Sequence, residues 1–250
     1  MPNRVEQLIQ DRIRAEGCIH MTLLDPEKKS GYDCAAIAKD AEAGGTAAIM
    51  VGGSTVASGV EMEDAVKRIK AAVKLPVIIF PNNIASITGA ADAIWFMSLL
   101  NSSNTYYLID SQAIGAPMVK KLGLETMPMG YIIVGYGGAA GYVGQARVVP
   151  YDRPELAVAY ASAAELLGMR YIYLEAGSGA PQPVTPHMIG AVRKYCKGTL
   201  IVGGGIRDPK AAVAAKRAGA QIIVTGTLVE EEKKVTERIS EITSALQAQA

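Results

Sequence analysis

The sequence has few cysteines and few large aromatic side chains. Its three cysteines, Cys18, Cys34 and Cys196, lie far apart and show no paired spacing, so neither a disulfide framework nor a zinc site is indicated. We expect buried thiols in a protein of the reducing cytoplasm. With two phenylalanines and one tryptophan, the core is expected to consist mainly of Ala, Gly, Ile and Val.

Neither charge sign is in excess, and no segment concentrates lysine and arginine. The formal net charge is +1. Binding to a nucleic-acid backbone needs a clustered basic footprint. We therefore predict no nucleic-acid partner, and we expect any bound anion to be small.

The sequence also lacks a run that predicts a transmembrane segment. Residues 126–146 carry no charge, but they include six glycines and Pro128. Glycine and proline destabilise a helix, so this stretch suits a buried strand leading into a glycine-rich loop. The first 15 residues are charged and amphipathic, unlike a signal peptide. They predict an N-terminal capping helix that docks through Val5, Leu8, Ile9 and Ile13.

Apolar strands and helical segments alternate along the whole chain, with no linker between them. The expected strands cover residues 17–24, 47–51, 77–80, 93–98, 129–134, 171–175, 199–202 and 221–224. The expected helices cover residues 33–43, 60–73, 111–122, 154–167 and 186–195, with two more starting near 208 and 228. Only a short Ala/Gly-rich segment separates the third strand from the fourth, which makes the third unit abbreviated.

Eight alternating units predict an α/β protein with a parallel sheet that closes into a TIM (β/α)8 barrel. Residues 1–250 then form a single domain of the size usual for this fold. The alternative is an open doubly wound sheet. Against it, no GxGxxG motif follows the first strand, where a dinucleotide-binding sheet carries that motif.

A barrel places the carboxyl ends of all its strands around one mouth, where ligands bind. The sixth strand runs straight into Glu175 and then into the small residues 176–179. This pattern is typical of a strand that delivers a carboxylate beside a loop whose backbone N–H groups can approach an anion. The competing interpretation is a solvated glutamate followed by an ordinary glycine turn.

The seventh and eighth strands both end in small residues. Gly203, Gly204 and Gly205 follow the seventh strand, and Gly226 and Thr227 follow the eighth. The N-terminus of a following helix favours negative charge, and TIM barrels usually bind phosphate at these two strand ends. Three glycines exceed what a tight turn needs, so the pattern predicts a phosphate site.

Two further strand ends carry hard oxygen ligands. Asp25 and Ser54 follow the first and second strands, and neighbouring oxygen ligands can share one Mg²⁺ that keeps water and substrate oxygens. Asp25 as a loop cap is an equal alternative. His20 and His187 have no carboxylate or second histidine at ligand spacing, so both are expected to be structural.

Several motifs together resemble one family. Residues 23–28, 52–54, 173–179, 203–206 and 226–227 look like the motifs of the geranylgeranylglyceryl phosphate synthases, in the same order from the first strand to the eighth. The resemblance implies a TIM-barrel prenyltransferase that moves a geranylgeranyl group from geranylgeranyl diphosphate to the C3 hydroxyl of sn-glycerol 1-phosphate. That reaction makes the first ether bond of archaeal membrane lipids.

The resemblance also implies roles for individual residues. Asp25 and Ser54 would hold Mg²⁺, and Glu175 would accept or orient the proton of the glycerol hydroxyl. No Asp-rich DDxxD box is present, so metal binding would depend on fewer carboxylates than in all-helical prenyl synthases. The residues implied for glycerol 1-phosphate are Tyr173, Leu174, Glu175, Ala176, Gly177, Ser178, Gly179, Gly204, Gly205, Gly226 and Thr227.

A geranylgeranyl chain needs a long apolar groove, and the abbreviated third unit is where one could open. Trp95 is a candidate stop that sets chain length, with core packing as its alternative role. A homo-oligomer, dimer or hexamer, is expected from the family, and peripheral membrane contact through the lipid product is left open. The alternatives are a heptaprenylglyceryl phosphate synthase with a longer donor, or a non-catalytic phosphate-binding barrel.

Overall fold

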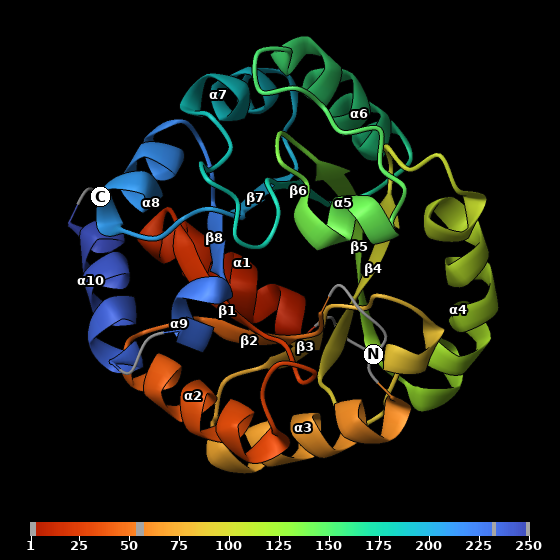
Figure 1. Ribbon diagram of the computed structural model, residues 1–250, viewed down its shortest axis with the longest axis vertical. Helices are drawn as coiled ribbons and strands as arrows, with labels where there is room; N and C mark the ends of the chain where they lie inside the picture. Colours follow the sequence, from red (N-terminus) through yellow and green to blue (C-terminus); the bar gives the residue numbers. More distant parts are fainter. Residues whose placement is uncertain (1–3, 54–57, 232–233, 249–250) are drawn as a thin grey trace.

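The computed structural model describes residues 4–53, 58–231 and 234–248. Eight parallel strands form a closed barrel in which each strand pairs with the next, and β8 pairs with β1. Figure 1 shows the helices as a ring around these strands. The predicted TIM barrel is therefore confirmed.

The strands are short and almost entirely buried, because side chains fill the barrel and helices cover its outer face. They are β1 (Ile19–Leu24), β2 (Ala48–Val51), β3 (Val77–Ile79), β4 (Ala93–Leu99), β5 (Glu125–Ile133), β6 (Tyr171–Glu175), β7 (Thr199–Gly203) and β8 (Ile222–Thr225).

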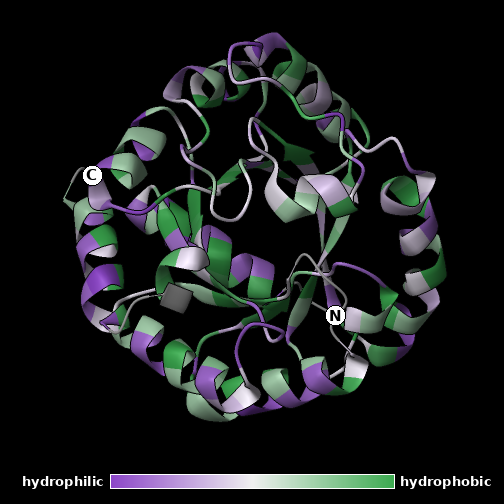
Figure 2. Ribbon diagram, in the orientation of Figure 1, coloured by the Kyte–Doolittle hydropathy of each residue, from purple (hydrophilic) through white to green (hydrophobic). Residues whose placement is uncertain are grey.

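The helices alternate with the strands and turn their apolar sides toward the barrel (Figure 2). They are α1 (Arg4–Glu16), α2 (Gly31–Ala43), α3 (Gly59–Ala72), α4 (Ser111–Leu122), α5 (Gly138–Val143), α6 (Pro154–Leu166), α7 (Pro186–Tyr195), α8 (Pro209–Arg217), α9 (Thr227–Glu231) and α10 (Val235–Gln247). Between β3 and β4 stands only the 3-10 turn η1 (Ile84–Ser86), so the abbreviated third unit is confirmed.

Two expectations are wrong, the start of β5 and the single last helix, and the structure adds two elements that the sequence does not predict. β5 begins at Glu125 rather than at residue 129, although Pro128 lies within it. The Pro128 carbonyl accepts from the N–H of Arg170, which precedes β6. The N–H that proline lacks would point to the same side, at a level where β6 has not yet begun. The glycine-rich loop contains α5, and α4 is preceded by a π-helical turn, η2 (Tyr106–Asp110). The helix expected from residue 228 is two helices, α9 and α10.

Helix α1 closes one end of the barrel, as the amphipathic pattern predicts. Its Val5, Ile9 and Ile13 pack into the same buried cluster as the inward-facing Met21 and Trp95. In Figure 1, α1 lies within the ring of outer helices. The predicted docking face is confirmed for these three residues, whereas Leu8 is 47% exposed.

Polar contacts fix the start of α1. The carboxylate of Glu125 accepts from the backbone N–H groups of Val5 at 2.9 Å and Glu6 at 2.7 Å. These are first-turn donors, which have no partner inside the helix. The Glu6 carboxylate then receives two hydrogen bonds from the guanidinium of Arg170. The start of α1 is thereby tied to β5 and β6.

We predict that Glu125→Ala lowers the free energy of unfolding by about 1 to 2 kcal/mol, because it removes the acceptor that caps α1. Urea denaturation at neutral pH measures this change. Glu63→Ala is the matched control, since Glu63 makes only an exposed ion pair with Lys67, which contributes about 0 to 1 kcal/mol. Equal stability losses in the two variants would contradict the capping role.

Candidate active site

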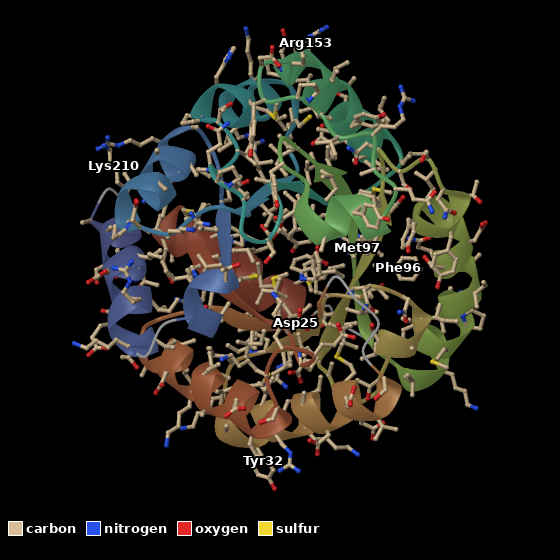
Figure 3. The ribbon with its side chains drawn as sticks, in the orientation of Figure 1. Asp25, Tyr32, Phe96, Met97, Arg153 and Lys210 are labelled. Carbon is tan, nitrogen blue, oxygen red and sulfur yellow. The ribbon has the colours of Figure 1, made fainter. Side chains whose placement is uncertain are left out.

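One large cavity opens at the carboxyl ends of the strands. The ends of strands β1, β6, β7 and β8 form its polar end. From there an apolar arm extends between β4, α4 and α5. Figure 3 shows Asp25 on the inner side of the helix ring, and Phe96 and Met97 in the direction of α4 and α5.

Glu175 ends β6 and lies in this cavity with only 7% of its surface exposed. Its Oε1 accepts from the backbone N–H of Gly177 at 2.6 Å. Burial raises the pKa of Glu175, and hydrogen bonds from the Tyr173 hydroxyl and the Gly177 N–H oppose this rise. A buried carboxylate held in this way can accept a proton at a higher pH than an exposed glutamate.

The glycines that follow β7 are required by Glu175 and its neighbours. A Cβ at Gly203 would lie 2.1 Å from the Tyr173 hydroxyl, and a Cβ at Gly204 would lie 2.4 Å from Glu175 Oε1. Gly204 also has a φ of +78°, which other residues rarely adopt. The triple glycine therefore has a packing reason independent of any ligand.

Gly226 differs from those glycines. Its φ is not in the left-handed region, and a Cβ there would meet only Leu23, at 3.4 Å or more. Neither backbone strain nor close packing among the described residues requires glycine here. Gly226 lines the cavity, so its missing side chain leaves the backbone open to close approach from the cavity.

Side chains tie the loops after β6, β7 and β8 to one another. The hydroxyls of Ser178 and Thr227 are 3.1 Å apart, and Arg207 donates through Nη2 to the carbonyl of Gly179 at 3.3 Å. All four residues line the cavity. The loops predicted to bind phosphate are thus adjacent. Sequence reasoning missed Arg207, because an arginine in a loop after glycines is not distinguishable from an ordinary solvated surface arginine.

Asp25 directly follows β1 and is 5% exposed. Its Oδ1 accepts from the N–H of Glu27 at 3.1 Å, and its Oδ2 lies 3.8 Å from Nζ of Lys28. Burial raises the pKa of Asp25, and the Glu27 N–H and the Lys28 charge oppose that rise. The carboxylate lies against Gly53, where a Cβ would come within 2.4 Å of Oδ1.

The donor set at Asp25 suits Mg²⁺ better than zinc. No group of three or more His, Cys, Asp or Glu that could hold a metal ion occurs among the residues that the structure describes. Mg²⁺ is commonly bound by one or two carboxylates plus water and phosphate oxygens, which Asp25 at the cavity wall allows. Ser54, the other predicted ligand, lies outside the described residues.

The apolar arm lies where the third unit is abbreviated. With η1 in place of a full helix, the outer face of β4 is left open beside α4. The apolar lining residues of the arm include Ile84, Ile87, Ile94, Phe96, Val119 and Val143.

Trp95 lies both in the core and on the cavity wall. It is fully buried, its ring contacts the edge of Tyr171 at 4.9 Å between centroids, and its side chain points into the barrel interior. Its Nε1 has no hydrogen-bond partner. Core packing of Trp95 is thus confirmed, whereas its role as a chain-length stop stays a prediction.

Three aromatic rings form a cluster in the barrel interior beside Glu175. Phe80, Tyr131 and Tyr173 make edge-to-face contacts with centroids 5.2 to 5.8 Å apart. All three line the cavity. Sequence reasoning missed Phe80 and Tyr131, because inward and outward positions of a buried strand are equally apolar.

The described residues include no helix long and apolar enough to cross a membrane.

Comparison with known proteins places this geometry in a family. Residues 10–246 match the model of the PcrB family. The chain is 50% identical to a geranylgeranylglyceryl phosphate synthase from Methanococcoides burtonii over 97% of this chain and 99% of that protein. It is 47% identical to another synthase of this name, from Thermofilum pendens, over 98% of this chain and 96% of that protein.

A solved structure agrees with these relatives. The (S)-3-O-geranylgeranylglyceryl phosphate synthase from Thermoplasma acidophilum, in complex with its substrate sn-glycerol-1-phosphate, superposes with a TM-score of 0.92 and 41% identity. The match covers 96% of this chain and 98% of that one. The chain therefore belongs to the PcrB family, the family of the geranylgeranylglyceryl phosphate synthases.

Proposed function

We propose that this enzyme transfers the geranylgeranyl group of geranylgeranyl diphosphate to the C3 hydroxyl of sn-glycerol 1-phosphate. The observation that carries the proposal is a single cavity that joins an apolar arm to a polar end, with the buried carboxylate of Glu175 in the polar end. The Thermoplasma acidophilum relative, which binds sn-glycerol-1-phosphate, supports the choice of acceptor.

The acceptor occupies the polar end. Its phosphate lies against the backbone of Gly204, Gly205, Gly226 and Thr227, where small residues allow close approach. The 173–179 segment holds the glycerol. Arg207 supplies a positive charge beside Gly179, and we add it to the phosphate-binding residues. Charge-assisted contacts of this kind are stronger than neutral ones.

The chemical step exchanges one carbon–oxygen bond for another. The bond between C1 of the prenyl chain and its diphosphate oxygen breaks, with positive charge developing on the allylic carbon. The C3 oxygen of the glycerol bonds to that carbon, and its proton passes to Glu175. The rings of Tyr131 and Tyr173 line the same cavity, and an aromatic ring in the site can stabilise positive charge.

The diphosphate lies near Asp25 and Lys28, at the other side of the polar end. Asp25 and Ser54 are the residues that would hold Mg²⁺. When bound, the ion would neutralise the charge of the leaving diphosphate. Burial disfavours the charged form of the Asp25 carboxylate. A cation bound beside it would stabilise that charged form.

The first prediction concerns the reaction and its base. The enzyme should convert geranylgeranyl diphosphate with sn-glycerol 1-phosphate and not with sn-glycerol 3-phosphate, in the presence of Mg²⁺. Glu175→Gln should lower kcat by roughly 10² to 10⁴, whereas Glu155→Gln, at the exposed start of α6, should leave it unchanged. Product formation is followed with a labelled prenyl donor.

The pH profile tests the same residue. Because the pKa of Glu175 is raised and the base must be deprotonated, kcat should fall as pH decreases through a value above the usual range for glutamate. Full activity in Glu175→Gln, or an acid limb unchanged by that substitution, would remove Glu175 as the base. Equal turnover of both glycerol phosphates would contradict the proposed acceptor.

The second prediction concerns the metal. Asp25→Asn keeps the size of the side chain and removes its charge, so the Mg²⁺ concentration that gives half-maximal activity should rise at least about tenfold. Asp33→Asn, at the exposed start of α2, is the matched control. Chelation by EDTA should abolish activity. An Asp25→Asn curve that overlays the control curve would show that Asp25 does not hold the ion.

The third prediction concerns chain length, which also separates the proposal from a heptaprenylglyceryl phosphate synthase. Trp95→Ala should turn over prenyl diphosphates longer than geranylgeranyl diphosphate, because it opens the inner wall of the cavity. Truncating a fully buried ring also costs about 3 to 5 kcal/mol of stability, so thermal melting must show a folded variant. A folded variant with unchanged length preference would leave Trp95 as core only.

A further inference from the structure

A buried polar cluster lies on the side of β1 that faces the outer helices, and one of its members, Thr225, also lines the cavity. It consists of His20, Thr22, Thr46 and Thr225, each no more than 3% exposed. The His20 ring nitrogens bridge two threonines. Nδ1 is 3.0 Å from Oγ1 of Thr46, and Nε2 is 2.9 Å from Oγ1 of Thr225. The proposed chemistry uses none of these four residues.

The hydrogen-bond network assigns the direction of each bond. Thr22 donates to Oγ1 of Thr46 at 3.1 Å, and Thr46 directs its own hydrogen to the carbonyl of His20 at 3.2 Å. A hydroxyl has one hydrogen to donate, so Thr46 accepts from Nδ1–H of His20. Burial lowers the pKa of His20 to about 3, which leaves the ring neutral with Nε2 as an acceptor. Thr225 therefore donates to Nε2.

Thr225 is the point at which β8 passes into the phosphate loop. β8 ends at Thr225, and its pairing with β7 stops one residue earlier, at Val224. Thr225 pairs only with Thr22 of β1. The next two residues are Gly226 and Thr227, which line the cavity. The bond to His20 is thus the side-chain anchor at the start of this loop.

We propose that His20 is a positioning residue for the acceptor phosphate: by holding the Thr225 hydroxyl, it fixes the backbone from which Gly226 and Thr227 contact the ligand. The proposal rests on the proposed function, which places the glycerol phosphate at that loop. A purely structural role would not require a histidine here, because burying polar groups costs free energy and an apolar side chain could fill the same layer.

The test uses substitutions that change single hydroxyls. Thr225→Val keeps the shape of the side chain and removes the donor, whereas Thr225→Ser retains it. Thr22→Val is the matched control, because Thr22 pairs with Thr225 through the backbone but donates its hydroxyl to Thr46 and not to Thr225. His20→Leu removes the acceptor and leaves the Thr225 hydroxyl in place. Titration calorimetry with sn-glycerol 1-phosphate, thermal melting and steady-state kinetics are measured for each.

We expect Thr225→Val and His20→Leu to raise the Kd and KM for sn-glycerol 1-phosphate about fivefold to tenfold, which is the size of effect of one hydrogen bond. The KM for the prenyl diphosphate should stay unchanged. Thr225→Ser should bind like the wild type. Thr22→Val should melt at a lower temperature but bind with the wild-type Kd.

Wild-type affinity in Thr225→Val, or an equal loss of affinity in Thr22→Val, would overturn the positioning role. So would wild-type affinity in a folded His20→Leu variant, because the hydroxyl would then act on the ligand without the histidine. If His20→Leu does not fold, the three threonine variants still decide the question. A wild-type enzyme that neither binds nor converts sn-glycerol 1-phosphate would refute the proposed function itself, which separates the two failures.

Discussion

The buried carboxylate of Glu175 is the constraint on which the mouth of the barrel depends. A carboxylate in this position must be hydrogen-bonded to be tolerated, and the Tyr173 hydroxyl and Gly177 N–H supply those bonds. The same carboxylate requires glycine at 203 and 204, where a Cβ would collide with it or with Tyr173. The need to place this carboxylate therefore constrains the loops after β6 and β7, which are the loops proposed to bind the acceptor.

The second organising feature is a missing helix. Where η1 replaces the helix of the third unit, the outer face of β4 is uncovered and an apolar arm joins the polar mouth. Most TIM barrels bind small polar ligands at this end. Here the shortened unit places an apolar arm beside the glycine loops, and in the proposed reaction the prenyl donor lies in that arm and the acceptor at those loops.

Much of this arrangement could be predicted from the sequence. The hydrophobic periodicity and the alternation of strands and helices predict the barrel. The expected strand ends then point to Asp25, Glu175 and the glycine loops. The interior aromatics were missed because strands buried on both faces carry no alternation that marks the inner side. The early start of β5 was missed because a proline usually marks a strand boundary. Pro128 can lie inside β5 because the neighbouring strand β6 begins only after it in the pairing, which the sequence does not reveal. The predicted Ser54 ligand, the oligomeric state and the cytoplasmic location stay predictions.

The most direct measurement is a crystal structure of the enzyme with sn-glycerol 1-phosphate and a thio analogue of geranylgeranyl diphosphate that cannot react. The account predicts the phosphate against the backbone of Gly204, Gly205, Gly226 and Thr227, and the prenyl chain along Phe96. It also predicts the C3 hydroxyl at about 2.6 to 3.2 Å from Glu175. A C3 hydroxyl directed away from Glu175, or a prenyl chain outside the apolar arm, would contradict it.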